Sequence, residues 1–128
     1  MEVNIPVSLG ELLDKISILE IKSVKISNES KLKNIKKELS GLKKVLENLN
    51  INFVEIKNLY EELYKINLGL WEIEDSIRIL EKDKNFEKDF IDLARSVYIT
   101  NDKRFQVKNE INKLFNSNYV EEKSYEDY

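Results

Sequence analysis

The stretch that decides the fold spans residues 53–82 and reads FVEIKNLYEELYKINLGLWEIEDSIRILEK. Its apolar residues return at intervals of three and four, which is the spacing of one face of an α-helix. They form a seam that consists of Leu59, Leu63, Ile66, Leu70, Ile73, Ile77 and Leu80. Asn52 stands just before the stretch as a side-chain cap, and Glu55 follows three residues later. The pattern predicts one helix of roughly 30 residues, about 45 Å long at 1.5 Å per residue.

The preceding segment carries a second seam of the same kind, made by Leu32, Ile35, Leu39, Leu42, Leu46 and Leu49. Such regular alternation of three and four is typical of coiled-coil packing. Only the short turn at residues 50–52 separates the two seams, and a tight turn between amphipathic helices predicts an antiparallel hairpin. We therefore expect Leu46 to lie beside Ile56, and Leu39 beside Leu63.

The first helix is predicted to begin after Ser8 and to run to about Ile26. Ser8 and Glu11 form a capping box, in which the serine oxygen accepts a backbone amide and the glutamate reaches back to the cap. Val7 and Leu12 occupy the positions of a hydrophobic staple. A helix that is apolar on more than one face packs against several neighbours, and here the apolar residues are Leu9, Leu12, Leu13, Ile16, Leu19 and Ile21.

The C-terminal third contains two shorter helical patterns and a polar tail. Apolar residues predict one helix from about Phe86 to Val97 and another from about residue 102 to residue 115. Residues 99–102 are rich in capping types, so a boundary or kink is expected there. From residue 116 the chain is polar and is expected to be a solvated tail, although it contains three tyrosines.

These elements predict an all-α fold in a single domain of residues 1–128. The architecture expected is an antiparallel bundle of four to five helices with a long, coiled-coil-like helix hairpin. The two seams and the apolar first helix present more apolar surface than a small monomer usually hides, and large exposed apolar patches mark interfaces. We therefore expect a homodimer.

The composition limits the chemistry that is available. The sequence has no histidine and no cysteine, so it has no imidazole base and no thiolate or imidazole metal ligand. This favours a binding or interaction protein over an enzyme, and no cofactor is expected. A net charge of −3 gives no general attraction to nucleic acid or to an anionic membrane. Without a signal-peptide pattern or an apolar run long enough to cross a bilayer, a cytoplasmic location is expected.

Arginine is rare in this chain, because all but three of the 21 basic residues are lysine. The positions of the arginines therefore indicate the candidate binding site. The three arginines fall within residues 78–104, among acids, and the planar guanidinium binds phosphate or carboxylate with two parallel hydrogen bonds. We predict a site for an anionic small molecule such as phosphate or a nucleotide sugar. Its residues would be Trp71, Glu74, Asp75, Arg78, Arg95, Asn101, Asp102 and Arg104. Salt bridges between helices are the structural alternative.

A metal-dependent activity is a second alternative. Glu11 and Asp14 are three residues apart, as are Glu72 and Asp75, and this spacing puts two carboxylates on one helix face. All-α nucleotide pyrophosphatases hold magnesium with such pairs. The spacing is also common by chance in a chain this rich in glutamate, and Glu11 is already explained as part of a cap.

Four phrases of the sequence belong together: residues 5–16, residues 70–78, residues 93–102 and residues 121–125. The set resembles an uncharacterised family of small all-helical bacterial and phage proteins, a domain of unknown function sometimes found beside glycosyltransferase or tetratricopeptide modules. The resemblance implies no established activity. It implies only an association with surface-glycan or nucleotide-sugar metabolism, which is not a mechanism.

Overall fold

The computed structural model describes residues 1–128 and contains four helices and no strand. The helices are α1 (Leu9–Lys25), α2 (Glu29–Glu47), α3 (Phe53–Lys82) and α4 (Lys88–Leu114). Three of them begin after a capping side chain: Ser8 Oγ accepts the amide of Glu11 at 3.2 Å, and Asn28 and Asn52 likewise accept backbone amides at the starts of α2 and α3. The caps at Ser8 and Asn52 are those that the sequence predicted. An all-α bundle is therefore confirmed. None of the four helices carries an apolar stretch of the length that a bilayer span requires.

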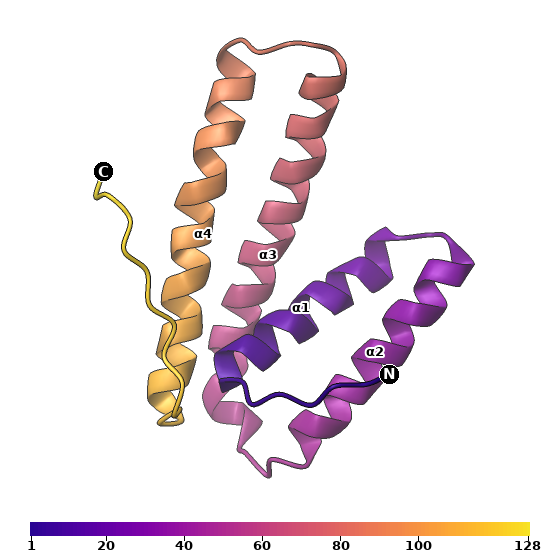
Figure 1. Cartoon of the computed structure of the whole chain (residues 1–128), viewed down its shortest axis with the longest axis vertical. Coiled ribbons are helices and arrows are strands. Elements are labelled where there is room, and N and C mark those ends of the chain that lie inside the picture. Colours follow the sequence, from indigo (N-terminus) through magenta and orange to yellow (C-terminus); the bar gives the residue numbers. More distant parts are fainter.

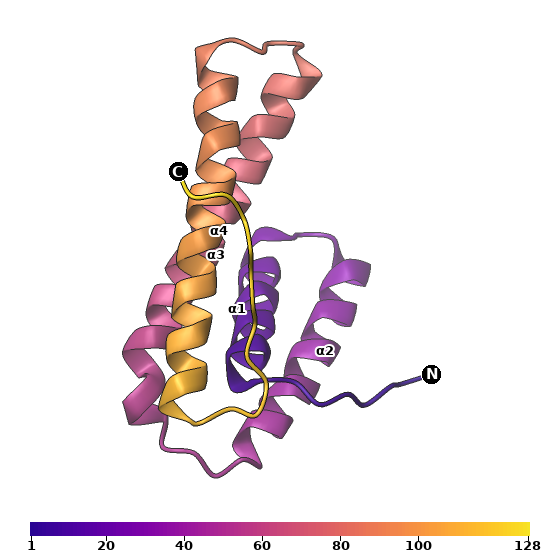
Figure 2. The same cartoon turned by 60° about the vertical axis from the view of Figure 1, so that its left-hand side comes forward.

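The helices form two antiparallel hairpins, one of α1 with α2 and one of α3 with α4 (Figure 1). The first hairpin lies across the lower half of the second, and the tip of the α3–α4 hairpin extends beyond it (Figures 1 and 2). Helix α1 packs against α2, α3 and α4. This is the central position that its several apolar faces predicted.

The predicted pairing of the second and third helices is wrong. No Cα atom of α2 lies within 8 Å of one in α3, because α1 packs against both helices and lies between them. The long hairpin of the fold is instead the one formed by α3 and α4. Leu46 and Ile56 still belong to one buried cluster, together with Leu12, Leu13, Ile16, Leu63, Val107 and Ile111. The apolar seam of α2 therefore packs into the common core against α1, and it does not form a hairpin with α3.

The predicted boundary at residues 99–102 is also wrong, since α4 continues through it without interruption. Capping propensity is a weak preference that tertiary contacts override. Here Asn101 and Asp102 are half-buried and face the C-terminal tail, so the helix keeps its polar residues in contact with another segment.

The C-terminal tail (residues 116–128) does not project into solvent as its composition suggested. It runs beside α4 in both views (Figures 1 and 2). The Tyr128 hydroxyl donates to Asp102, the Tyr128 ring meets Tyr98 edge-on with centroids 5.3 Å apart, and Lys123 lies over the Phe105 ring. The tail is therefore held beside the helix by a few side-chain contacts, while its tyrosines stay largely exposed.

Candidate functional site

A polar cluster joins α1 to α4 at the centre of the molecule, and its first element is an ion pair between Asp14 and Arg104. Asp14 is only 1% exposed. Its carboxylate accepts hydrogen bonds from Arg104 Nε at 2.9 Å and from Arg104 Nη2, so the guanidinium binds it with two donors. The hydrogen bond to Asp14 raises the pKa of Arg104, against the effect of burial. Bidentate arginine–carboxylate pairs are among the stronger polar contacts in proteins.

Two neutral side chains, Asn67 and Ser17, also bind Asp14. Asn67 of α3 donates from Nδ2 to Asp14 Oδ1 at 2.9 Å and to Ser17 Oγ at 2.8 Å, and Ser17 Oγ donates to the backbone oxygen of Asp14 at 2.7 Å. Asp14, Ser17 and Asn67 are all buried. A buried polar network is stable only when its members are satisfied, and this one connects three helices.

Lys108 lies one turn after Arg104 on the same face of α4, and its side chain is only 8% exposed. Its ammonium lies 2.8 Å from Glu11 Oε2, 3.0 Å from Glu121 Oε2 and 4.0 Å from Asp14 Oδ2. Burial lowers the pKa of Lys108, but the carboxylates of Glu11, Glu121 and Asp14 outweigh it and hold the pKa above the ordinary value. The lysine therefore stays charged, and it connects α1, α4 and the tail.

The start of α1 approaches α4 very closely, which brings these charges together. The amide of Gly10 donates to Asn112 Oδ1 at 2.7 Å. A Cβ atom on Gly10 would lie 2.6 Å from the backbone oxygen of Lys108, closer than real Cβ contacts come. Only glycine therefore fits at this position without a shift of one helix.

Beside the cluster lies a cavity of about 230 Å³, here called the cation pocket. Its lining consists of Glu11, Asn101, Arg104, Phe105, Lys108, Glu121 and Lys123. Lys123 forms no salt bridge; its ammonium lies 5.0 Å from the centre of the Phe105 ring and 6.0 Å from that of Tyr125. Such cation–π contacts leave the ammonium able to bind an anion.

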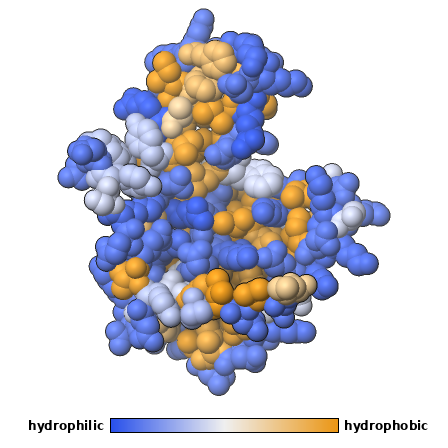
Figure 3. Space-filling view, in the orientation of Figure 1, coloured by the Kyte–Doolittle hydropathy of each residue, from blue (hydrophilic) through white to orange (hydrophobic).

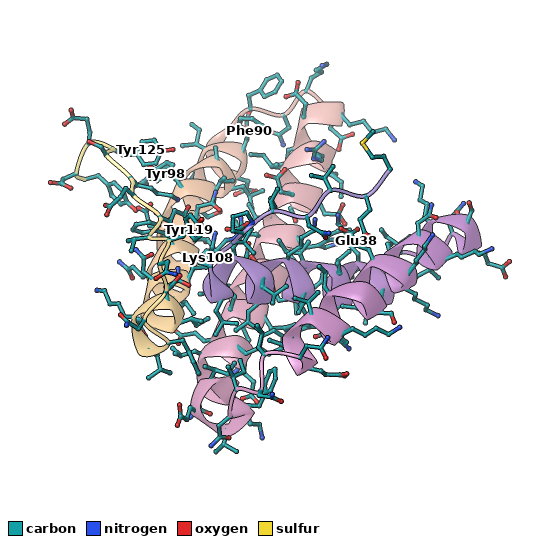
Figure 4. The ribbon with its side chains drawn as sticks, turned by 60° about the horizontal axis from the view of Figure 1, so that its bottom comes forward. Glu38, Phe90, Tyr98, Lys108, Tyr119 and Tyr125 are labelled. Atoms are coloured by element: carbon teal, nitrogen blue, oxygen red, sulfur yellow. The ribbon has the colours of Figure 1, made fainter.

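A larger cleft of about 1110 Å³ lies next to it, between α4 and the tail, and is here called the aromatic pocket. Three residues, Asn101, Phe105 and Lys123, line both pockets. Its other walls include Val97, Tyr98 and Asp102 of α4 and Tyr125 and Tyr128 of the tail. Figure 4 shows Lys108 where α1 meets α4, with Tyr98 and Tyr125 farther along toward the free end of the tail.

The structure divides the eight residues of the predicted site into two groups. Asn101, Asp102 and Arg104 line the two pockets. The other five, Trp71, Glu74, Asp75, Arg78 and Arg95, line neither pocket. Arg78 pairs with Glu74 one turn away at 3.3 Å, and its side chain is 78% exposed, so this is a surface helix pair.

The predicted site did not include Asp14, Asn67, Lys108, Glu121 or Lys123. Some indications were present. Asp14 shares a helix face with Glu11, and Glu121 and Lys123 lie in a phrase of the resemblance. Asn67 is a polar residue four positions after Leu63, a buried leucine of the seam. Residues four apart share a helix face, so Asn67 lies on the side of α3 that faces the core. Nothing local in the sequence indicates that these residues meet.

The carboxylate pair predicted for magnesium is present but is used differently. Glu11 and Asp14 do share a face of α1, and their partners are the cations Lys108 and Arg104. No group of three or more carboxylates converges to hold a metal ion. The Glu11 side chain thus turns to Lys108, while its backbone amide completes the cap at Ser8.

A family model described as "Family of unknown function (DUF6165)" matches the chain over residues 1–128. No curated protein matches the chain, and no solved structure does. The match confirms the resemblance to a family of unknown function that four phrases of the sequence indicated.

Proposed function

We propose that this chain, which belongs to the DUF6165 family of unknown function, is a small helical binding protein for a phosphorylated ligand. Its anionic group would lie in the cation pocket, and the rest of the ligand would extend into the aromatic pocket. The protein acts by binding, without catalysis of its own, in the cytoplasm.

The observation that carries this proposal is the set of unused donors in the cation pocket. Lys123 has no carboxylate partner. Arg104 uses Nε and Nη2 for Asp14, and its Nη1 makes no hydrogen bond within the protein. The amide of Asn101, which lines the same pocket, also has no side-chain partner. A guanidinium, an ammonium and an amide around one cavity provide the charge and the donors that a phosphate group binds.

The neighbouring aromatic pocket supports a ligand with a ring attached to the phosphate. Tyr98, Phe105 and Tyr125 offer ring faces and edges for a base or a sugar, and Asp102 offers an acceptor for hydroxyl groups. Ligand sites commonly combine apolar walls with a few polar groups that fix orientation. A nucleotide sugar combines phosphate groups with a base and sugars. We therefore propose more specifically that the protein has a role accessory to surface-glycan or nucleotide-sugar metabolism.

The test is a thermal-shift screen of inorganic phosphate, nucleotides and nucleotide sugars, followed by calorimetric titration of the hits. Lys123→Ala should weaken binding about tenfold or more, because a charge-assisted hydrogen bond contributes about 1.5–3 kcal/mol. It should change the melting temperature little, since Lys123 is exposed, forms no salt bridge and contacts only aromatic rings.

Lys103→Ala is the matched control, because Lys103 is an exposed lysine on α4 that lines neither pocket. Equal losses in Lys103→Ala and Lys123→Ala would indicate nonspecific charge attraction. Absence of any hit in the screen would contradict the proposed function.

A further inference from the structure

One carboxylate in the cation pocket comes from the tail rather than from the helical body. Glu121 places Oε2 3.0 Å from Lys108 Nζ, on an ammonium that Glu11 already contacts at 2.8 Å. The charges lining or adjoining the pocket are then three cations, Arg104, Lys108 and Lys123, and three carboxylates, Glu11, Asp14 and Glu121. Without Glu121 the same cluster would hold one uncompensated positive charge.

The tail is attached to α4 by side chains alone. From residue 118 to the C-terminus no backbone–backbone hydrogen bond connects it to the rest of the molecule. Its attachments are the Glu121 ion pair, the Lys123 contact with Phe105, and the contacts of Tyr128 with Asp102 and Tyr98. Segments with few buried contacts and no backbone pairing open at low free-energy cost.

We infer that residues 118–128 form a lid over the binding site, and that the Glu121 carboxylate occupies the place on Lys108 that the anionic group of the ligand takes. This inference rests on the proposed function and specifies how the site is regulated. When the lid opens, Lys108 loses one of its two close carboxylates and becomes available. A phosphate then replaces Glu121, and Lys123 closes over it from the same segment.

The geometry separates this exchange from a purely structural salt bridge. A structural bridge needs only one carboxylate on Lys108, and Glu11 provides it from the rigid first turn of α1. The second carboxylate comes from the tail, which can move away without disturbing the core, since no tail residue belongs to the buried cluster. The Glu121 carboxylate keeps the empty cation pocket neutral, and so raises the concentration of anion that is needed to fill the pocket.

The experiment compares Glu121→Gln with the wild type, using inorganic phosphate as the probe in calorimetric titrations at constant ionic strength. Removal of the competing charge should tighten phosphate binding about tenfold, as expected when a state that excludes the ligand is lost. Chymotrypsin should also cleave at Tyr125 several times faster in Glu121→Gln, because the lid loses its ionic attachment. Glu122→Gln is the matched control, since the neighbouring Glu122 is exposed and forms no salt bridge; it should change neither quantity.

The outcomes for the lid and for the proposed function are distinguishable. If Glu121→Gln and the wild type bind phosphate equally while Lys123→Ala loses binding, the lid is overturned and the anion site stands. If neither the wild type nor Glu121→Gln binds phosphate or any ligand of the screen, both are overturned. Binding that appears only in Glu121→Gln would support the lid in its strongest form.

Discussion

Asp14 and Arg104 lie 90 positions apart in the sequence and form a two-donor ion pair in the interior of the protein. The pair fixes the first helix across the α3–α4 hairpin. Asp14 is almost fully buried, and the Arg104 side chain is 29% exposed, at the edge of the cation pocket. One guanidinium thus both holds the fold together and lines the cation pocket.

Loss of either partner of this pair should destabilise the fold strongly. Removing one partner of a buried ion pair costs about 3–5 kcal/mol, because the other charge stays buried and uncompensated. Asp14→Ala and Arg104→Ala should therefore each lower the free energy of unfolding by roughly that amount, as measured by urea denaturation. Arg78→Ala, at an exposed helix pair, should change it by less than about 0.5 kcal/mol. Equal small effects at Arg78 and Arg104 would contradict the structure.

Two glycines should respond to alanine with opposite signs. A Cβ on Gly69 would meet nothing within 4 Å, and Gly69 lies inside α3, so Gly69→Ala should stabilise the protein by about 1 kcal/mol through helix propensity. Gly10→Ala should destabilise it, because the new Cβ would collide with the backbone of α4. Thermal denaturation measures both, and a stabilising Gly10→Ala would show that α1 does not approach α4 so closely.

Alkaline pH should destabilise the fold through Tyr60 and Lys108. Burial and the hydrogen bond to Glu20 raise the pKa of Tyr60, and the neighbouring carboxylates raise that of Lys108. A group with a raised pKa in the folded state stabilises fully below its ordinary pKa, and the contribution is lost as the pH rises through the folded value. Stability should therefore fall above about pH 10, where unfolded tyrosine and lysine begin to deprotonate.

Tyr60→Phe provides the control for this pH dependence. It should cost about 1 kcal/mol at neutral pH through the lost hydrogen bond and should flatten the decline above pH 10. The measurement is urea denaturation at a series of pH values. An unchanged alkaline slope in the variant would show that Tyr60 does not contribute.

The outer half of the α3–α4 hairpin should mediate the homodimer that the sequence predicts. No side chain beyond Asn67 on α3 or before Val107 on α4 is buried. On α4, Phe90 and Ala94 lie one turn apart and are half-buried. The α1–α2 hairpin does not reach the outer part of the α3–α4 hairpin (Figure 1). Figure 3 shows apolar side chains gathered over this part of the hairpin.

A second copy would cover this face and form a four-helix arrangement with the first. Light scattering at tens of micromolar should give twice the mass of the chain. Phe90→Asp should shift the protein to the monomer without loss of helix content, because Phe90 lies outside the buried core. A monomeric wild type would contradict the prediction.

The sequence by itself determined the local elements. The cap at Ser8, the start of α3 after Asn52 and the length of α3 all follow from residues within a turn or two of one another. Helical periodicity and capping are short-range properties, so one sequence is enough to read them. The residue types also limited the site to charged, amide and aromatic chemistry.

Only the tertiary structure decided which helices pair and which charges meet. The seam of α2 packs against α1 and not against α3, because α1 is apolar on several faces and lies between them. Asp14, Asn67, Arg104, Lys108 and Glu121 come from three helices and the tail. Apart from Arg104, which the sequence distinguishes as one of only three arginines, each is an ordinary polar residue in its local sequence. A charge acquires its role from the partners that folding places within a few ångströms of it.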